Sequence, residues 1–166
     1  MLPMRYRMSS IPMILLMLSA SPTLAQAQAT GDASGARAPM AVVPVTEAIN
    51  RDFQPLYPDR PEGPNLVVLD GDPKSGPSLT LFRYGRDYTG SGNLHFHTHD
   101  YRLWLIEGGL KHWDEDGREA TATRLEPGAY VYQPAHLLHA ANCLTDRCIA
   151  YVAFDGPIET GLPAGE

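Results

Sequence analysis

The segment HFHTHDYRLWLIE, residues 95–107, decides how the rest of the chain is interpreted. Three of the chain's six histidines stand here at alternate positions, His95, His97 and His99, ahead of an apolar run. Residues two apart in an extended strand share a face, so the three histidines and Tyr101 are predicted to point the same way, about 6.5 to 7 Å apart at Cα. Neighbouring imidazoles at that spacing can share one metal ion. A half-exposed edge strand that happens to be rich in histidine is the alternative.

Short runs with strand character flank this segment on both sides, and each is closed by turn residues. They cover residues 65–69, 78–84, 110–113, 118–125, 129–133, 137–143 and 148–154. Asp-Glu-Asp-Gly at 114–117 is typical of a hairpin turn between two of these runs. One short helix is predicted over residues 46–53, with Thr46 as its cap and Ile49 and Phe53 on one face.

These strands, together with 15 Gly and 15 Pro in 166 residues, predict an all-β chain with a single folded domain. Short strands at regular spacing with almost no helix are typical of a sandwich or a small barrel. A jelly-roll barrel encloses its own cavity, where an inward-facing row of histidines would be shielded from bulk water. That is the setting that a metal site needs.

The first 27 residues have the pattern of an export signal. Two arginines near the start are followed by a short apolar core at 11–18 and by a small-x-small cleavage site at 25–27. We therefore expect a periplasmic or secreted protein, cleaved after Ala27 or Ala29. The apolar core is too short to span a bilayer, and a membrane anchor that is never cleaved is the alternative.

The chain is predicted to divide into a signal peptide, a flexible tether, a folded domain and a tail, over residues 1–27, 28–40, 41–160 and 161–166. Loss of Arg5 and Arg7 with the signal would lower the net charge from −6 to −8. An acidic surface disfavours nucleic acid and anionic membranes as partners, and no membrane span is expected in the mature chain.

Cys143 and Cys148 are the two cysteines of the chain, and export would place them where disulfides persist. The four residues between them have the length of a hairpin loop. The two thiols are therefore expected to face each other across paired strands and to form a disulfide. A redox-active pair and two free thiols are the alternatives.

The chain resembles a cupin, a member of a family of small jelly-roll proteins whose two motifs supply metal ligands. The first motif of the family has two histidines separated by one residue, a Glu four positions later and a Gly after the next strand. His95, His97 and Gly108 fit this pattern, but Tyr101 stands at the Glu position. The chain is similar to a group of exported bacterial cupins in which this motif has the form His-x-His-x3-Tyr-Arg.

The second cupin motif has Gly, Pro, Gly and His at fixed spacing, usually followed by Asn. Gly128, Pro134 and His139 keep that spacing, His136 replaces the second Gly, and Asn142 comes one residue early. The resemblance covers residues 64–156 and implies the cupin fold and a metal. It implies no substrate, because cupins include dioxygenases, isomerases, decarboxylases, storage proteins and sensors. Cupins commonly pair through sheet edges, so a homodimer is one assembly that the resemblance implies.

The resemblance and the strand pattern together predict a three-imidazole metal site formed by His95, His97 and His139. Three neutral ligands leave the charge of a dication uncompensated, which favours an acidified water or an anionic substrate. The fourth ligand is left open between Tyr101, His99 and water. Tyr101 is a candidate catalytic proton donor or oxygen ligand, with simple aromatic packing as the alternative. His99 is a candidate catalytic or substrate-binding group.

His112 is predicted to face either the cavity or the solvent, and His136 to be a solvated turn residue. Iron, zinc, copper, manganese and nickel all remain candidate metals, and affinity alone favours copper and zinc over iron or manganese. Loading outside the cytoplasm would let that order of affinities act, which weakens the case for an iron-dependent oxygenase. Some cupin dioxygenases nevertheless carry a three-His iron site, so the resemblance keeps that hypothesis.

Three functional hypotheses follow from the sequence. The first is a metal-dependent enzyme acting on a small metabolite, either dioxygenase-like or isomerase/hydrolase-like. The second is a non-catalytic periplasmic protein or sensor that binds a metal or a small ligand, and it is motivated by the missing Glu. The third is a structural cupin whose site holds no metal.

Overall fold

The computed structural model describes residues 40–86, 88 and 93–163. The predicted export signal, the tether up to residue 39 and the end of the predicted tail at 164–166 lie outside the described residues. The elements are α1 Val45–Ala48, β1 Gln54–Pro55, β2 Asn65–Gly71, β3 Ser78–Gly85, β4 Phe96–His97, β5 Tyr101–Glu107, β6 Leu110–Asp114, β7 Arg124–Leu125, β8 Tyr130–Gln133, β9 His139–Cys143, β10 Arg147–Phe154 and β11 Thr160–Gly161.

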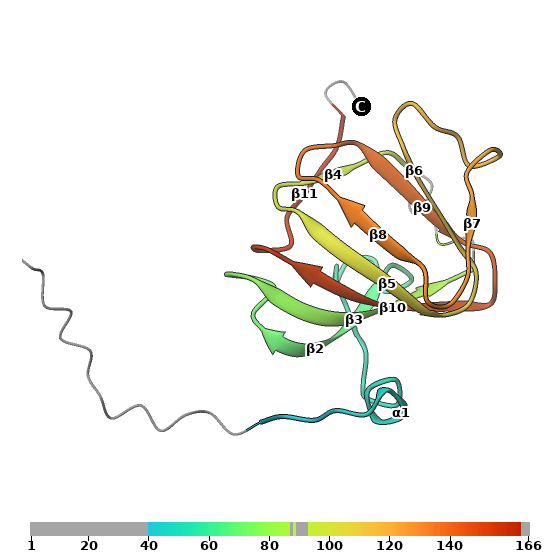
Figure 1. Ribbon diagram of the computed structural model, residues 1–166. Coiled ribbons are helices and arrows are strands. Elements are labelled where there is room, and N and C mark those ends of the chain that lie inside the picture. The colour runs from blue at the N-terminus through green and yellow to red at the C-terminus, as the bar shows by residue number, and fades with distance from the viewer. Residues whose placement is uncertain (1–39, 87, 89–92, 164–166) are drawn as a thin grey trace, which may run out of the picture. The chain divides into compact units, whose positions relative to one another are not determined.

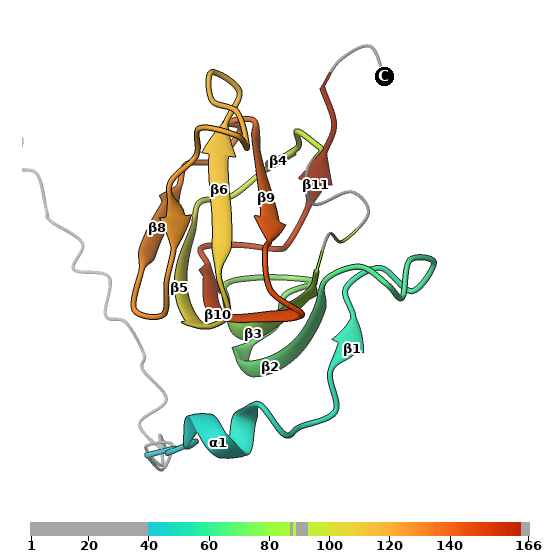
Figure 2. The same ribbon diagram turned by 90° about the vertical axis from the view of Figure 1, so that its right-hand side faces the viewer.

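The strands form two larger sheets and one small sheet (Figure 1, Figure 2). Six strands lie in the order β1-β2-β3-β10-β5-β8, three lie in the order β7-β6-β9, and β11 pairs with β4. All paired strands are antiparallel. From β5 to β10 the chain passes between the two larger sheets four times, which is typical of a jelly-roll barrel. The predicted all-β jelly-roll fold is confirmed.

The main core cluster contains residues of both larger sheets. Leu103 and Leu105 of β5 pack in one cluster with Leu110 of β6 and Cys143 of β9. Alternate side chains of β5 are buried, because Tyr101 is 6 %, Leu103 2 % and Leu105 0 % exposed, as the period of a strand requires. Burial of a leucine contributes about 2 kcal/mol. The two leucines therefore fix the face of β5 that turns inward, and Tyr101 lies on that face.

The disulfide between Cys143 and Cys148 joins the two larger sheets, because it links the end of β9 to the start of β10. The predicted bond is confirmed, but the expected hairpin is wrong. β9 pairs with β6, and β10 pairs with β3 and β5, so residues 144–146 pass from one sheet to the other. Gly108 has a φ of +87°, and a Cβ on it would lie 2.9 Å from the Cys148 sulfur. Only glycine fits there without movement.

The helix α1 is shorter than the predicted helix at 46–53. Pro44 precedes it, and no side chain caps it, so Thr46 is not its cap. The helix ends early because the chain turns to bury Phe53 in a second cluster with Val67 and Leu81. No helix among the described residues is long and apolar enough to cross a membrane.

The predicted strand at 118–125 is reduced to β7, which has two residues. The Arg118 carbonyl accepts hydrogen bonds from the N–H groups of Thr121 and Ala122, at 3.1 and 2.9 Å, so the chain forms turns there. Lys111 Nζ also donates to the Glu119 carbonyl at 2.6 Å. β6 and β7 still pair antiparallel, so the predicted hairpin is present, but a long loop replaces the tight turn expected at 114–117.

Candidate metal centre

Main-chain hydrogen bonds bring the two histidine-bearing segments together. His95 N donates to His139 O at 2.9 Å, and His139 N donates back to His95 O at 2.8 Å. His136 N donates to His97 O at 2.8 Å, so β4 is attached to the same segment two residues further along. The positions of the three predicted metal ligands are thus fixed by the backbone, which holds them more precisely than side-chain contacts alone would.

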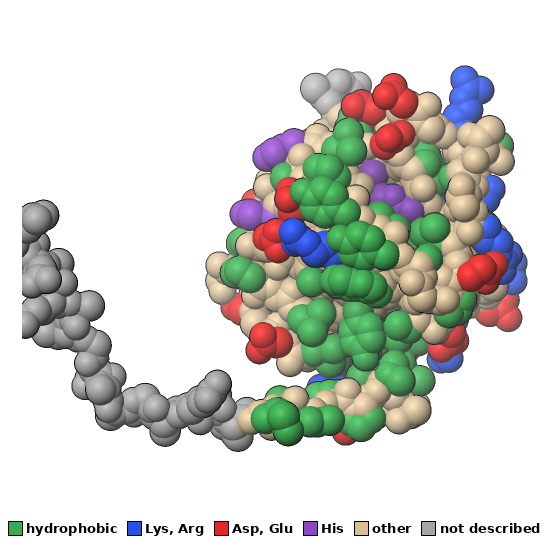
Figure 3. Space-filling view, viewed as in Figure 1, with side chains coloured by type: hydrophobic (Ala, Val, Ile, Leu, Met, Phe, Trp, Pro, Cys, Tyr) green, Lys and Arg blue, Asp and Glu red, His purple; other side chains and the backbone are tan. Residues whose placement is uncertain are grey.

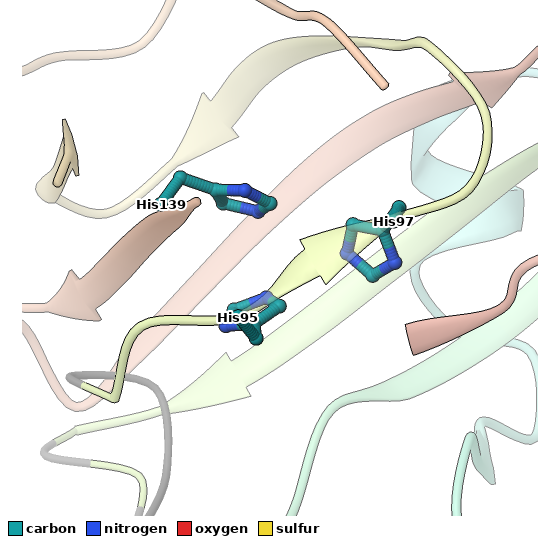
Figure 4. A group of neighbouring side chains, drawn as sticks. All are labelled: His95, His97 and His139. Atoms are coloured by element: carbon teal, nitrogen blue, oxygen red, sulfur yellow. The ribbon is translucent and has the colours of Figure 1, made fainter. Parts of the chain in front are cut away.

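His95, His97 and His139 form one cluster, and their side chains surround a common space (Figure 4). Their ring centroids are 5.2 Å apart for His95 and His97, 4.4 Å for His95 and His139, and 5.3 Å for His97 and His139. The ring nitrogens that the three residues can offer a metal all lie within 4.8 Å of one another. Two nitrogens bound to one ion at roughly 2.0 to 2.1 Å are at most about 4.2 Å apart, so small rotations of the side chains bring this cluster to the spacing that a shared zinc-like ion requires.

Each of the three imidazoles is oriented by a backbone carbonyl. His95 Nδ1 contacts Asn93 O at 2.9 Å, His97 Nδ1 contacts Glu159 O at 3.0 Å, and His139 Nδ1 contacts Leu137 O at 3.1 Å. A carbonyl oxygen only accepts, so each Nδ1 carries the proton and each Nε2 keeps a lone pair. This arrangement is how proteins orient metal-binding histidines. The donor set fits a divalent transition metal held by three Nε2 atoms.

Burial keeps the clustered imidazoles neutral. Desolvation, followed by the charge of His95, lowers the pKa of His97 to about 4 and the pKa of His139 to about 2. Desolvation also lowers the pKa of His95, against the hydrogen bond to Asn93 O. Imidazoles must be neutral to bind a metal, so at neutral pH no proton has to leave the cluster first.

Tyr101 connects the cluster to a fourth histidine. Its Oη lies 3.0 Å from His139 Nε2 and 2.9 Å from His112 Nε2. Because His139 Nδ1 is protonated, His139 Nε2 can only accept, and the Tyr101 hydroxyl donates to it. The remaining bond then needs an N–H on His112 Nε2, which donates to the Tyr101 oxygen. Burial raises the pKa of the Tyr101 phenol well above its usual value, so this hydroxyl keeps its proton.

The sequence left the orientation of His112 open, and the structure turns it inward. Its ring stacks on that of His139, with centroids 5.1 Å apart and an interplanar angle of 11°. Desolvation, with a smaller effect of His95, lowers the pKa of His112 to about 4. The signal that could have found it is the buried Leu110, because residues two apart on β6 share a face.

The structure does not bring His99 to the cluster. β4 ends at His97, and the chain bends over residues 98–100, so the shared face predicted for the segment breaks before β5 begins. Asp100 holds the bend by accepting hydrogen bonds from Ala135 N at 2.8 Å and Tyr132 Oη at 2.6 Å. The His99 ring lies against Gly156, where a Cβ would come within 2.2 Å of it. A catalytic role for His99 stays a prediction that this position does not favour.

The cluster lines a cavity of about 390 Å³. Apart from the four histidines and Arg60, its walls are aromatic, aliphatic or neutral polar. They consist of Leu56, Tyr57, Pro64, Phe82, Tyr84, Tyr88, Asn93, Tyr101, Leu103, Ala141, Phe154, Thr160 and Leu162. No Asp or Glu among the described residues lines the cavity, so the cluster has imidazoles and the Tyr101 phenol as its donors.

The outer face of β5 and β8 carries exposed aromatic side chains, and hydrophobic side chains form a band on that face (Figure 3). Trp104 is 39 %, Tyr130 52 % and Tyr132 48 % exposed. The Trp104 and Tyr130 rings contact each other, with centroids 5.3 Å apart. These residues point away from the cavity and take no part in the site.

No protein-family model and no curated protein matches the sequence. Solved structures do match the fold. A proposed acetylacetone dioxygenase from Methylibium petroleiphilum is 18 % identical, with a TM-score of 0.55 over 78 % of this chain and 86 % of that one. The DMSP lyase DddQ from Ruegeria pomeroyi is 18 % identical, with a TM-score of 0.53 over 69 % of this chain and 63 % of that one. This chain therefore spans less than two thirds of the lyase.

KdgF from Halomonas sp. is 21 % identical, with a TM-score of 0.46 over 63 % of this chain and 88 % of that one. A protein from Shewanella frigidimarina, described as an RmlC-like cupin, is 17 % identical, with a TM-score of 0.49 over 67 % of this chain and 87 % of that one. At these identities the likeness concerns the fold.

Proposed function

We propose that this chain, which has the cupin fold, is an exported metalloprotein that binds a divalent transition metal through His95, His97 and His139 and acts on a small metabolite. One observation carries the proposal: all three Nδ1 atoms are bonded to backbone carbonyls, which leaves three Nε2 lone pairs at one cavity wall. Iron, zinc, copper, manganese or nickel would satisfy such a donor set to different degrees.

A metal in this site would acidify a bound water or polarise an oxygen of the substrate, because three neutral ligands leave its charge uncompensated. The chain's own contribution is a proton at Tyr101 Oη. In the structure that proton is donated to His139 Nε2. Once the His139 lone pair is engaged, the hydroxyl loses this acceptor, and Tyr101 can present its proton to a ligand in the cavity while His112 still donates to its oxygen.

Two classes of chemistry suit this arrangement. The structural neighbours include a proposed dioxygenase and a lyase, so both oxygen-dependent and oxygen-independent reactions occur on the fold. A proton donor beside a Lewis-acid site suits isomerisation, elimination or hydrolysis, and open metal positions also suit dioxygen chemistry. The enzyme class is therefore proposed as metal-dependent, dioxygenase-like or isomerase/hydrolase-like.

A non-catalytic binding or sensing role is the alternative, and one observation favours it. The cavity has no carboxylate among the residues that line it in the described part of the chain, because Tyr101 stands where the cupin motif has Glu. A site with neutral ligands alone could retain a metal or an anionic ligand without turning it over.

Export is proposed from the predicted signal at 1–27, and the disulfide between Cys143 and Cys148 is compatible with it, since such bonds persist outside the cytoplasm. Expression of the full chain in a Gram-negative host, followed by fractionation and intact-mass measurement, tests this. Mature protein in the periplasm that begins after Ala27 or Ala29 is the expected result, and uncleaved protein retained in the cytoplasm would contradict it.

Metal content tests the site. We expect untagged protein from metal-replete cells to hold near-stoichiometric metal, and the double variant His95→Ala/His139→Ala to hold almost none. His136→Asn is the matched control, because it also removes an imidazole, but one outside the cluster. Equal metal in the double variant and the control would overturn the proposal, provided that circular dichroism shows both variants folded.

Catalysis is tested separately with the metal-loaded protein. Dioxygen uptake and product formation would be screened against small metabolites, with the metal-stripped protein and Tyr101→Phe alongside. Turnover that requires both the metal and the hydroxyl supports the enzyme. Tight binding of one metabolite without product supports the binding role instead.

A further inference from the structure

Arg60 is the one formally charged residue that lines the cavity within the described part of the chain. It lies in the loop between β1 and β2, where its carbonyl accepts a hydrogen bond from Gly63 N and its own N–H donates to Tyr57 O, both at 2.9 Å. Its side chain is exposed, which places it at the solvent side of the cavity. Arg60 is thus a single cation at the cavity of a chain whose net charge is −6.

Arg60 has no carboxylate partner among the described residues. The five ion pairs there use other arginines, namely Arg51, Arg86, Arg102, Arg124 and Arg147. An unpaired guanidinium presents all five of its N–H donors to water or to a ligand. Arg83 and Arg118 likewise form no ion pair among the described residues, so the feature that sets Arg60 apart is its position at the cavity.

The Tyr57 ring holds the Arg60 guanidinium. The Arg60 Cζ lies 4.7 Å from the Tyr57 ring centroid, within the range of a cation–π interaction. Tyr57 is itself fixed, because its Oη is 2.6 Å from Thr160 Oγ1. Thr160 Oγ1 in turn lies 3.2 Å from His97 Nδ1. A continuous set of contacts therefore links Arg60 to a proposed metal ligand on the same cavity wall.

We propose that Arg60 binds the carboxylate of a small monocarboxylate ligand whose other end carries an oxygen donor directed at the His95, His97 and His139 cluster. This inference rests on the proposed metal site and names the class of substrate that the site takes. A guanidinium stacked on one face keeps its edge free, and its fork matches the two oxygens of a carboxylate. The positively charged centre at the other end would favour the same anion.

The walls between the two ends define the middle of the ligand. Leu56, Phe82, Leu103 and Phe154 are apolar, and no acidic side chain of the described chain lines the cavity to repel an anion. An apolar body is therefore expected. A phosphate monoester, with a charge of about −2, usually recruits several cations or a set of backbone N–H groups, and the cavity offers it Arg60 alone among charged side chains.

The test measures binding in place of turnover. Lactate, levulinate and benzoate are titrated calorimetrically into the protein, each beside its primary amide, with methyl phosphate as a further probe. The wild type, Arg60→Lys, Arg60→Gln and the control Arg118→Gln are compared, each with and without metal. Arg118 is an exposed arginine that does not line the cavity, so its loss changes the net charge equally.

We expect at least one carboxylate to bind the wild type about tenfold or more tightly than its amide. Arg60→Gln should remove that preference, Arg60→Lys should keep part of it, and Arg118→Gln should leave it intact. The proposal is overturned if no carboxylate binds, if Arg60→Gln keeps the preference, or if methyl phosphate binds more tightly than every carboxylate.

Metal content is measured on the same samples, which separates the two proposals. Full metal loading without a preference that depends on Arg60 overturns the ligand class and leaves the metal site standing. A preference that depends on Arg60 in protein that takes up no metal even when metal is supplied supports the anion subsite and overturns the proposed function.

Discussion

His95 and His139 exchange two main-chain hydrogen bonds, from N to O at 2.9 Å and back at 2.8 Å, although they lie far apart in the sequence. This pair is an isolated antiparallel bridge between the first residue of β9 and the residue just before β4. Its effect is to place two imidazoles on one wall of the cavity, with ring centroids 4.4 Å apart. The distance between the two rings is therefore set by the backbone, and a ligand placed there meets a site that needs little rearrangement.

The Tyr101 hydroxyl is expected to stabilise the metal-free protein. Tyr101→Phe leaves His139 Nε2 without its donor and the N–H of His112 without its acceptor, in a region where Tyr101 is 6 % exposed. Loss of buried hydrogen-bond partners costs about 1 to 3 kcal/mol. Urea unfolding should show this loss, while the control Tyr130→Phe, on the exposed outer face, should stay within about 0.5 kcal/mol of the wild type. Equal stabilities would contradict the arrangement of donors described above.

The metal-free protein should lose stability as the pH falls from about 6.5 to about 4. Burial lowers the pKa of both His97 and His112 to about 4, from an ordinary 6.5. The unfolded chain then binds protons that the folded chain excludes, so the stabilisation is complete above pH 6.5 and is lost as the pH drops toward the folded-state pKa. Each group contributes on the order of 3 kcal/mol over this range.

Urea midpoints measured across that range in the presence of a chelator check this prediction. His112→Gln is the matched variant, since its side-chain amide can still donate to Tyr101 but does not titrate. Its stability should fall less steeply with pH than that of the wild type. The same slope in both proteins would show that His112 does not contribute.

The disulfide that links the two larger sheets is expected to affect the free energy of unfolding more than the geometry of the cavity. A ring closed by Cys143 and Cys148 is short, so its removal in the variant Cys143→Ala/Cys148→Ala should cost roughly 2 kcal/mol by chain entropy. Thermal unfolding with and without dithiothreitol measures the loss, and dithiothreitol should not affect the double variant. An unchanged metal content in the folded variant is expected, since neither cysteine lines the cavity.

His136 occupies a left-handed backbone conformation, with a φ of +61°, where the second cupin motif has Gly. This conformation strains the backbone of any residue with a side chain, and β-branched residues tolerate it least. His136→Gly should therefore keep or raise the free energy of unfolding, whereas His136→Val should lower it by about 1 kcal/mol or more. Chemical denaturation of the wild type and the two variants measures these free energies of unfolding. A valine variant as stable as the wild type would show that the backbone changes its conformation to accommodate the side chain.

The sequence predicted the strands well where one face is apolar. Leu103 and Leu105 alternate with Arg102 and the exposed Trp104, and the strand they mark, β5, lies within the segment 95–107. The segment at 118–123 has no such apolar face, and hydrogen bonds within it produced turns in place of a strand. Turns of this kind depend on single contacts, such as that of Lys111 with the Glu119 carbonyl. A periodic pattern in the sequence does not predict such contacts.

The cluster of His95, His97 and His139 was predictable because two features coincide, alternation at the first two and the motif spacing at the third. The position of His99 away from the cluster was not predictable, because the alternation of residues along a strand does not show where the strand ends. The bend after His97 is held by Asp100 through groups on a distant segment. Which groups form a hydrogen bond across the fold depends on the tertiary structure. For the same reason the sequence did not predict the contact of His112 with Tyr101.

The strand nearest the end of the described chain holds the orientation of His97. β11 pairs with β4, and the carbonyl of Glu159 and the hydroxyl of Thr160 both contact His97 Nδ1. A chain still being synthesised, or one cut short before residue 159, would carry all three imidazoles and yet leave one of them free to rotate. Metal capture would then wait until the segment with residues 159 and 160 has folded onto β4.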